Sequence, residues 1–287
     1  MRIKLERRYI PIMATVVVAV LLYVISGLVF PGFFSPQVLI NFFTDNAFLG
    51  ITALGMTFVI ISGGIDLSVG AVIALTGLAI ADLVSNRGFS PMAALPIALA
   101  IGPLLGLVMG LLIHFFKGPP FIVTLAGMFF ARGMAHVISL ESIPIYHPFF
   151  MDFMINGLEL GERAFVPWIT IIFILLFLAC AYLAHYTSFG RNVYAIGGNN
   201  QSAVLMGLPA GRTRIAVYAL NGLFSALAGL VYTMYTSAGY GLTGVGLELD
   251  AIASVVIGGT LLTGGVGFIG GTVIGVIIQG IIQTFIS

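Results

Sequence analysis

The chain has 287 residues, of which 60% are hydrophobic and only 7% are charged. Soluble domains carry about 25% charged residues, so this chain cannot cover its surface against water and must face lipid over most of its length. A formal net charge of +1 gives no electrostatic basis for nucleic-acid binding. The single cysteine, Cys180, excludes an internal disulfide, and the sequence has no Cys/His spacing typical of a metal site. We therefore expect no cofactor and no metal.

Apolar stretches of membrane-spanning length follow one another along the chain. A spanning helix needs about 20 mostly apolar residues. The first stretch follows the basic segment 1–8, is longer than the apolar region of a signal peptide and is not followed by a cleavage-site pattern. We expect one all-α transmembrane bundle over 1–287, with about nine spans at 9–30, 47–62, 69–86, 92–115, 119–140, 166–186, 215–238, 251–264 and 266–286.

Basic residues separate from acidic ones when the N-terminus is placed in the cytoplasm, where loops collect Lys and Arg. The connecting segments on that side then hold Arg2, Lys4, Arg7, Arg8, Lys117, Arg191, Arg212 and Arg214. The opposite segments, 31–46, 87–91, 141–165 and 239–250, hold Arg87 and Arg163 together with the acids Asp45, Glu141, Asp152, Glu159, Glu162, Glu248 and Asp250. The pattern predicts a cytoplasmic N-terminus, a cytoplasmic segment 187–214 and a periplasmic segment 141–165.

Glycines recur every four residues in two apolar stretches. Gly102, Gly106 and Gly110 form one series, and Gly267, Gly271 and Gly275 form the other. Helices in lipid associate through small residues that allow close backbone contact, so both series predict tight helix–helix seams. Chance repetition in a glycine-rich chain is the alternative.

Enzymatic chemistry has little support in the sequence. A P-loop needs Lys followed by Ser or Thr, but Lys4 precedes Leu and Lys117 precedes Gly. No Ser/His/Asp arrangement is recognisable, so we expect no catalytic residues and no ATP hydrolysis by this chain itself.

The segment Ile61-Ser-Gly-Gly-Ile-Asp-Leu-Ser-Val-Gly70 interrupts two apolar stretches with glycines and polar residues. Asp66 or Ser68 can cap the following helix by accepting hydrogen bonds from its free N–H groups. Alternatively, the break lines a substrate path, because irregular backbone at membrane depth is tolerated where it borders a cavity. The two interpretations are compatible.

Two polar segments are candidates for partner binding. Segment 187–214 contains several glycines and a predicted short helix at 202–206, and it is either a docking element for another protein or a plain basic loop. The outer segment 141–165 combines acids with aromatic residues, which suggests a place for an external partner.

Six stretches of the sequence carry a family resemblance. They are Thr44-Asp-Asn-Ala-Phe-Leu-Gly50, Gly55-Met-Thr-Phe-Val-Ile-Ile-Ser-Gly-Gly-Ile-Asp-Leu-Ser-Val-Gly70, Thr124-Leu-Ala-Gly-Met-Phe-Phe130, Glu141-Ser-Ile-Pro144, Tyr194-Ala-Ile-Gly-Gly-Asn199 and Leu247-Glu-Leu-Asp-Ala-Ile-Ala-Ser-Val-Val-Ile-Gly-Gly-Thr260. These stretches resemble the permeases of binding-protein-dependent ABC importers for ribose, galactose and related sugars, particularly the galactofuranose type. The resemblance covers nearly the whole chain.

The resemblance implies an inner-membrane core of two permease subunits, identical or different, bound to a cytoplasmic ABC ATPase and fed by a periplasmic sugar-binding protein. It places the coupling segment at 189–208, with Gly190, Arg191, Gly197, Gly198, Asn199 and Gly207 as candidate contacts to the ATPase. Relatives continue with a tenth span, so we expect a C-terminal truncation at Ser287.

A neutral sugar requires hydrogen-bonding groups along its path. The candidates are Asp66, Ser68, Thr124, Asn221 and Tyr232. The main rival is a proton-coupled secondary sugar transporter with Asp66 and Asp82 as its relay; a membrane enzyme acting on lipids and a passive channel are further alternatives.

Overall fold

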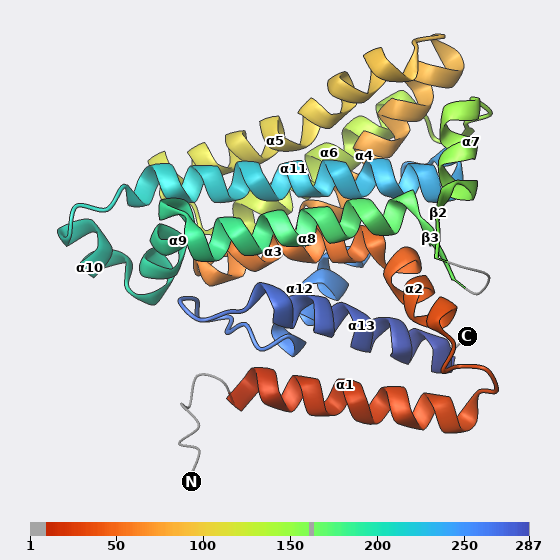
Figure 1. The fold of residues 1–287 in the computed structure, drawn as a ribbon. Coiled ribbons are helices and arrows are strands. Elements are labelled where there is room, and N and C mark those ends of the chain that lie inside the picture. Colours follow the sequence, from red (N-terminus) through yellow and green to blue (C-terminus); the bar gives the residue numbers. More distant parts are fainter. Residues whose placement is uncertain (1–9, 161–163, 287) are drawn as a thin grey trace, which may run out of the picture.

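The computed structural model describes residues 10–160 and 164–286 (Figure 1). Helices dominate, and the strands form two antiparallel pairs, β1 with β4 and β2 with β3. The elements are α1 (Ile10–Val29), α2 (Pro36–Asp45), α3 (Ala47–Ile61), α4 (Val69–Ala81), the π-helical turn η2 (Asp82–Asn86), α5 (Pro91–Phe115), α6 (Pro120–Ile138), β1 (Ile143–Pro144), α7 (Pro148–Ile155), β2 (Gly157–Glu159), β3 (Phe165–Pro167), α8 (Trp168–Tyr186), α9 (Ser188–Gly198), α10 (Asn200–Leu205), α11 (Ala210–Thr236), β4 (Ala238–Gly239), α12 (Leu247–Ile257) and α13 (Ile269–Ile286).

The long helices lie roughly side by side along one direction, as a membrane bundle requires (Figure 1). Within the described part of the chain, seven helices are long and apolar enough to cross a bilayer, and the pair α2 and α3, bent by 60°, makes an eighth candidate. The all-α, multi-spanning fold is confirmed. The eighth predicted span, 251–264, is wrong in its bounds, because α12 ends at Ile257 and the chain then turns.

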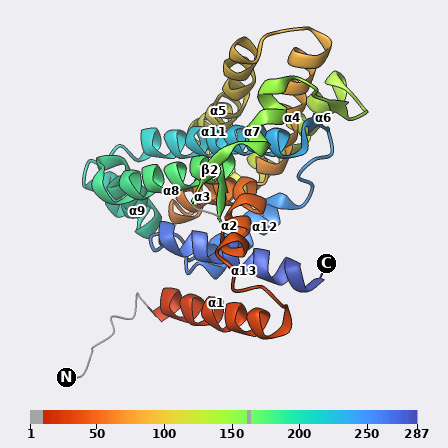
Figure 2. The ribbon, with the colours of Figure 1, turned by 45° about the vertical axis from the view of Figure 1, so that its right-hand side comes forward.

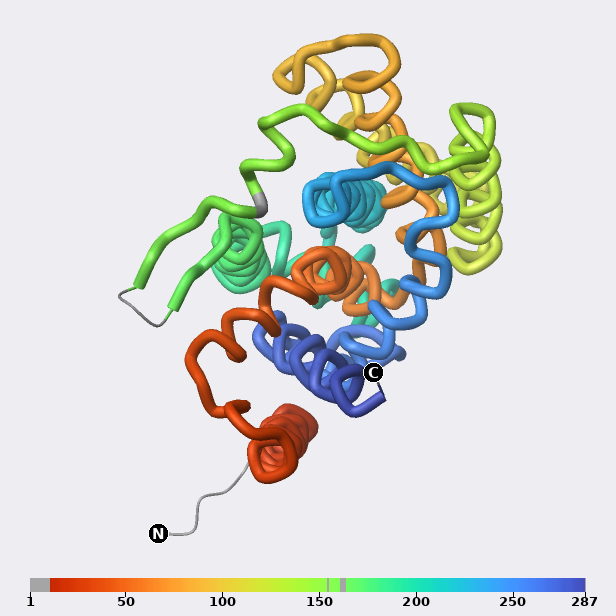
Figure 3. The backbone as a smooth tube through the Cα atoms, turned by 90° about the vertical axis from the view of Figure 1, so that its right-hand side faces the viewer, coloured from red at the N-terminus to blue at the C-terminus, as the bar shows by residue number. Residues whose placement is uncertain are grey.

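The centre of the bundle is formed by α3 and α4. Both are apolar on all sides, which is typical of a helix surrounded by other helices, and nearly all their side chains are buried. Viewed along the bundle, α3 is encircled by α11, α8, α13 and α12 (Figure 3). In contrast, α1 lies at the margin against α13 (Figures 1 and 2), and its apolar side chains are largely exposed, as expected for a helix in lipid.

The predicted seam at Gly102, Gly106 and Gly110 is confirmed, and the second seam is confirmed for Gly271 and Gly275, whereas Gly267 precedes α13 and packs against the Ile61 side chain. A Cβ atom on Gly102 or Gly106 would overlap backbone carbonyl oxygens of α11, and one on Gly271 or Gly275 would overlap carbonyl oxygens of α12 and the turn after it. The α5–α11 pair is the most extensive helix contact in the bundle. Close backbone approach through small residues therefore holds these helices together.

The two ends of the bundle differ in the way the loop charges predict. The start of α1 lies at the same end as α9 and α10, whereas α2, α7 and the β2–β3 hairpin lie at the other end (Figure 1). Thr15 Oγ1 donates a hydrogen bond to the carbonyl of Ile257, which fixes the end of α12 at the α9 end.

The segment 239–250 is not wholly an external loop, contrary to the expectation from charge. Gly239 packs against Gly77 near the end of α4, whereas Gly244 packs against Gly70 near its beginning. The segment therefore runs back along α4 into the bundle before α12 begins. Its glycines lower the hydropathy, which makes an inserted stretch resemble a surface loop.

Candidate functional site

Asp66 anchors the turn between α3 and α4. Its carboxylate is fully buried. Oδ1 accepts hydrogen bonds from the backbone N–H of Ser68 at 2.9 Å and from its hydroxyl at 2.6 Å, and Oδ2 accepts one from Asn221 Nδ2 at 2.8 Å. Both oxygens are thus satisfied, as a buried carboxylate requires. The turn that opens α4 is tied to the middle of α11.

Thr124 at the start of α6 joins the same cluster. Its hydroxyl oxygen lies 3.2 Å from the backbone nitrogen of Leu67, from which it accepts a hydrogen bond, and 2.9 Å from the carbonyl oxygen of Pro120. The structure thus brings together four of the five side chains predicted for the translocation path. They are at most 1% exposed, so in this conformation the cluster offers no surface to a sugar.

Tyr232 lies apart from that cluster. It follows Asn221 by eleven residues on α11, which corresponds to about 16 Å along a helix axis. Its ring packs edge-on against Phe48, with the ring centroids 5.0 Å apart. The role of Tyr232 in the path remains a prediction, and Tyr232 lies at a different place in the bundle from the other four residues.

The two carboxylates of the proton-relay hypothesis lie at opposite ends of one helix. Asp66 precedes α4, and Asp82 follows it, some 16 residues or about 24 Å further along. Asp82 forms an ion pair of 2.7 Å with Arg87. This separation is too long for direct proton transfer between the two groups.

The predicted coupling segment contains two short helices. Thr187 caps α9 by accepting a hydrogen bond from Gly190 N, and Asn199 caps α10 by accepting one from Ser202 N at 2.9 Å. The helix expected at 202–206 is therefore present slightly earlier, as α10. The longer helix α9 was missed because its three glycines suggest a loop, although Val193 and Ile196 form a buried face.

Gly197 places α9 directly against the two glycine-rich turns of the bundle. A Cβ at this position would overlap the carbonyl oxygen of Ile61 and lie 2.6 Å from the nitrogen of Gly265. Gly265 N in turn donates a hydrogen bond of 2.8 Å to Ile61 O. We call this three-way contact of α9 with the turns 62–68 and 258–268 the glycine junction.

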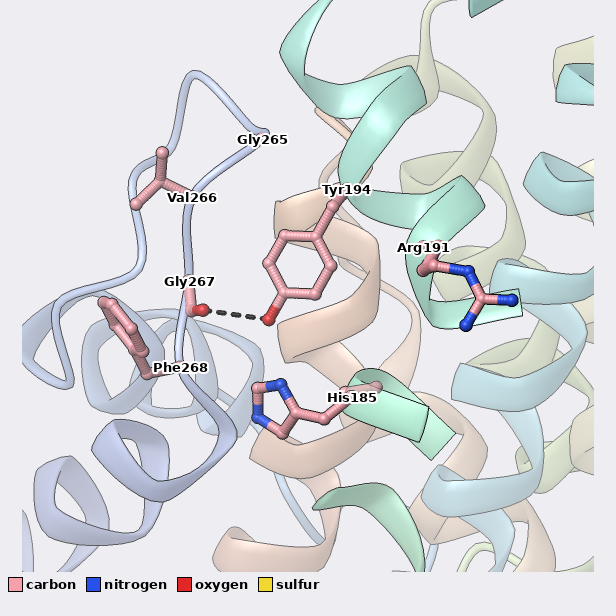
Figure 4. A pocket seen from close by; sticks show the side chains of 8 residues that line it. His185, Arg191, Tyr194, Gly265, Val266, Gly267 and Phe268 are labelled. Atoms are coloured by element: carbon pink, nitrogen blue, oxygen red, sulfur yellow. Dashed lines mark hydrogen bonds between the residues drawn. The ribbon is translucent and has the colours of Figure 1, made fainter. Parts of the chain in front are cut away.

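A second contact strengthens the glycine junction. The Tyr194 hydroxyl donates a hydrogen bond of 2.9 Å to the carbonyl of Gly267 (Figure 4). Beside it lies a cavity of about 460 Å³, which His185 and Arg191 also line (Figure 4). Through packing and hydrogen bonds, α9 therefore contacts both the end of α3 and the turn that leads into α13.

The other candidate coupling residues divide into two groups. Gly190 packs against the carbonyl of Ala184, and Gly207 has a φ of +78° in the turn that ends α10. Both glycines are therefore required by the local backbone geometry. Arg191, Gly198 and Asn199 are exposed, and a Cβ on Gly198 would meet nothing within 4 Å. Arg191 and Gly198 lie on α9 and Asn199 directly follows it, so these three residues present part of an exposed surface.

Arg132 is a polar residue that no motif in the sequence singles out. It lies within α6 and donates hydrogen bonds of 2.7 Å to the carbonyls of Gly241 and Thr243. Both carbonyls belong to residues 238–246, the part of the chain that runs back along α4 and that we call the inserted segment. Glu248 lies close enough to interact electrostatically, and its buried Oε2 has no hydrogen-bond partner among the described residues. An arginine inside an apolar span is itself a functional signal, and here it contacts irregular backbone that packs beside the candidate span α6.

Comparison with known proteins fits this architecture. A family model described as a branched-chain amino acid transport system/permease component matches residues 38–287. The chain belongs to this permease family. No solved structure matches it.

Several curated relatives of the permease are similar over nearly its whole length. The inner membrane ABC transporter permease protein YjfF of Escherichia coli K12 is 51% identical, with 98% of this chain and 85% of the relative aligned. The fructose import permease protein FruG of Bifidobacterium longum is 38% identical over 99% of this chain and 85% of its own length. The ribose import permease protein RbsC of E. coli K12 is 38% identical over 92% of this chain and 82% of its own length. The chain is a multi-pass membrane permease of the ABC transporter class, and its relatives are transport proteins, not enzymes.

Proposed function

We propose that this permease forms the translocation path of an ATP-driven importer for a monosaccharide. The observation that carries the proposal is the similarity over nearly the whole chain to permeases named for fructose and ribose import. The hydrogen-bonding side chains within an otherwise apolar bundle suit a neutral, hydroxyl-rich substrate. Ribose and galactofuranose are the candidates, and galactofuranose rests on the sequence resemblance alone.

The proposed partners bind at opposite ends of the bundle. A cytoplasmic ABC ATPase would contact the exposed part of α9 and α10, which carries Arg191, Gly198 and Asn199. A periplasmic sugar-binding protein would dock on 141–165, where α7 and the β2–β3 hairpin lie. A second permease subunit, identical or different, would complete the path. This arrangement sets the protein in the bacterial inner membrane with a cytoplasmic N-terminus.

In the proposed mechanism, the glycine junction passes the movement of the ATPase to the membrane helices. Movement of the ATPase would displace α9, which pushes on the turns 62–68 and 258–268 at once. The first turn is tied through Asp66 to α11 and through Thr124 to α6, so these helices would tilt together. In this scheme Asp66, Ser68, Thr124 and Asn221 shape the wall of the path, and the inserted segment 238–246 forms another part of it.

Purification of the tagged chain from its native membranes tests the partner assignment. We expect an ABC ATPase, a second permease and a periplasmic sugar-binding protein to accompany it. Arg191→Glu should reduce recovery of the ATPase at least tenfold without affecting the binding protein, because Arg191 is exposed on α9. Glu159→Lys, exposed at the opposite end, should do the reverse. If neither partner is recovered with the unaltered chain, the proposed function is wrong.

A further inference from the structure

Two cavities lie in line along the helix pair α5 and α6. One, of about 520 Å³, is at the end that carries α9 and α10, and we call it the basic pocket; its lining includes His114, Lys117, Asn200, Arg214, Tyr218 and the turn 62–64. The other, of about 440 Å³, is a groove between the two helices, lined by Leu104, Leu105, Val108, Met109, Leu112, Val123, Ala126, Gly127 and Phe130. Both volumes are in the range of small-ligand sites, about 300–1,000 Å³.

The charge of the basic pocket favours an anion. Lys117 and Arg214 contribute two positive charges, and no acidic side chain lines the cavity. Neither forms an ion pair with a described residue, and Arg214 donates to the neutral side chain of Asn200 at 3.1 Å. Two cations in the lining favour a negatively charged ligand over a neutral sugar. The buried Asp66 carboxylate, which is not part of the lining, interacts electrostatically with Tyr218.

Tyr218 supplies independent evidence for a ligand in the basic pocket. Its side chain is 1% exposed, and its hydroxyl has no hydrogen-bond partner among the described residues. The hydroxyl lies beside Gly64, another residue of the pocket lining. A buried hydroxyl without a partner is costly, and an acceptor oxygen in the pocket would remove that cost.

The turn between α5 and α6 brings Lys117 to the basic pocket. Lys117 directly follows the C-cap of α5 and has a φ of +51°, the left-handed conformation with which helices commonly end. The way α5 ends therefore places a basic residue in the lining of the pocket.

The apolar groove and the pocket rim identify what kind of anion fits. The groove contains only apolar residues and continues along α5 and α6 away from the basic pocket. Beside the pocket, large apolar side chains at the end of α5 and the start of α6 are exposed, namely Phe115, Phe116, Phe121 and Ile122. Charged groups at the helix ends next to an apolar channel match the two parts of a phospholipid.

We propose that the basic pocket and the groove together bind one anionic phospholipid. The headgroup phosphate would accept hydrogen bonds from Lys117, Arg214 and Tyr218, and one acyl chain would fill the groove. The headgroup would then touch Gly63 and Gly64, in the turn that Asp66 anchors. A lipid in this site would stabilise that turn. Because the turn is part of the glycine junction, the lipid composition of the membrane would then affect coupling to the ATPase.

Lipid binding to the purified full-length chain tests the proposal, with phosphatidylglycerol, phosphatidylcholine and inorganic phosphate as probes in native mass spectrometry. Phosphatidylglycerol should bind, and the double variant Lys117→Gln/Arg214→Gln should weaken it roughly 30-fold, because each basic residue near an anionic lipid contributes about a factor of five. Arg212→Gln removes an exposed charge at the same end but outside the pocket, and it should leave binding unchanged.

A second pair of variants examines the groove and does not alter any charge. Ala126→Phe should exclude the acyl chain from the groove and weaken the binding of phosphatidylglycerol at least tenfold. Val137→Phe, on an exposed part of α6 outside the groove, should leave this binding unchanged. Equal binding of phosphatidylglycerol and phosphatidylcholine would overturn the proposal, as would phosphate binding as tightly as the lipid. If the ATPase no longer copurifies with the double variant while lipid binding is unchanged, the pocket is a contact site for the ATPase and the lipid proposal is wrong.

Discussion

Gly197→Ala is expected to abolish coupled transport, because the new methyl group would have to displace backbone on both sides. It would overlap Ile61 O and approach Gly265 N, and neither atom belongs to a flexible side chain that can move away. Overpacking of this kind costs about 1–3 kcal/mol. The three-way contact therefore opens, and α9 no longer moves the ends of α3 and α13 with it.

The matched control for this variant is Gly270, a helical glycine on the other side of the glycine junction. Gly270→Ala adds the same methyl group to the first turn of α13, but in open space with nothing within 4 Å. Uptake of sugar into cells should fall at least tenfold in Gly197→Ala and remain near wild type in Gly270→Ala, at equal amounts of protein in the membrane. Equal uptake by the two variants would show that the glycine junction does not transmit the motion.

Asp66→Ala is expected to destabilise the permease severely, whereas Asp66→Asn should be tolerated. Alanine removes three hydrogen bonds to a charged group, each worth about 1.5–3 kcal/mol, and leaves buried donors of Ser68 and Asn221 unsatisfied. The loss should reach at least about 3 kcal/mol. Asparagine keeps the shape, and its amide can donate to Asn221 Oδ1 once the Asn221 amide turns over, since that oxygen has no partner among the described residues.

Thermal unfolding in detergent and uptake in cells measure these two variants. Asp66→Ala should lower the midpoint of unfolding by several degrees and reduce the amount of folded protein. Asp66→Asn should retain most of the transport. A proton relay requires a group that titrates, so an inactive but stably folded Asp66→Asn protein would support the relay and refute an anchoring role.

The bundle itself was predictable because lipid imposes simple rules on sequence. A deficit of charge and repeated apolar stretches of spanning length give the fold class, and glycines spaced by four give the α5–α11 seam. Among the described residues, the connecting segments assigned to opposite sides by charge also lie at opposite ends of the bundle, with 239–250 as the exception (Figure 1). Which end faces the cytoplasm stays a prediction. These signals are local, so they can be read from one chain.

Features that depend on distant contacts were harder to anticipate. The hydrogen bond between Asp66 and Asn221 joins residues 155 apart, and nothing in either segment identifies the other. Segment 238–246 resembles a surface loop until Arg132 is seen to satisfy its carbonyls. Likewise α9 contains glycines that usually break helices, and its stability comes from the buried face and the Thr187 cap.

We expect a separate ATPase to drive sugar through this permease. The decisive measurement is uptake of a labelled monosaccharide by proteoliposomes that contain the permease, its copurified partners and the binding protein. Uptake should require ATP and persist when a protonophore collapses the proton gradient. Uptake that proceeds without nucleotide and stops with the protonophore would contradict the account.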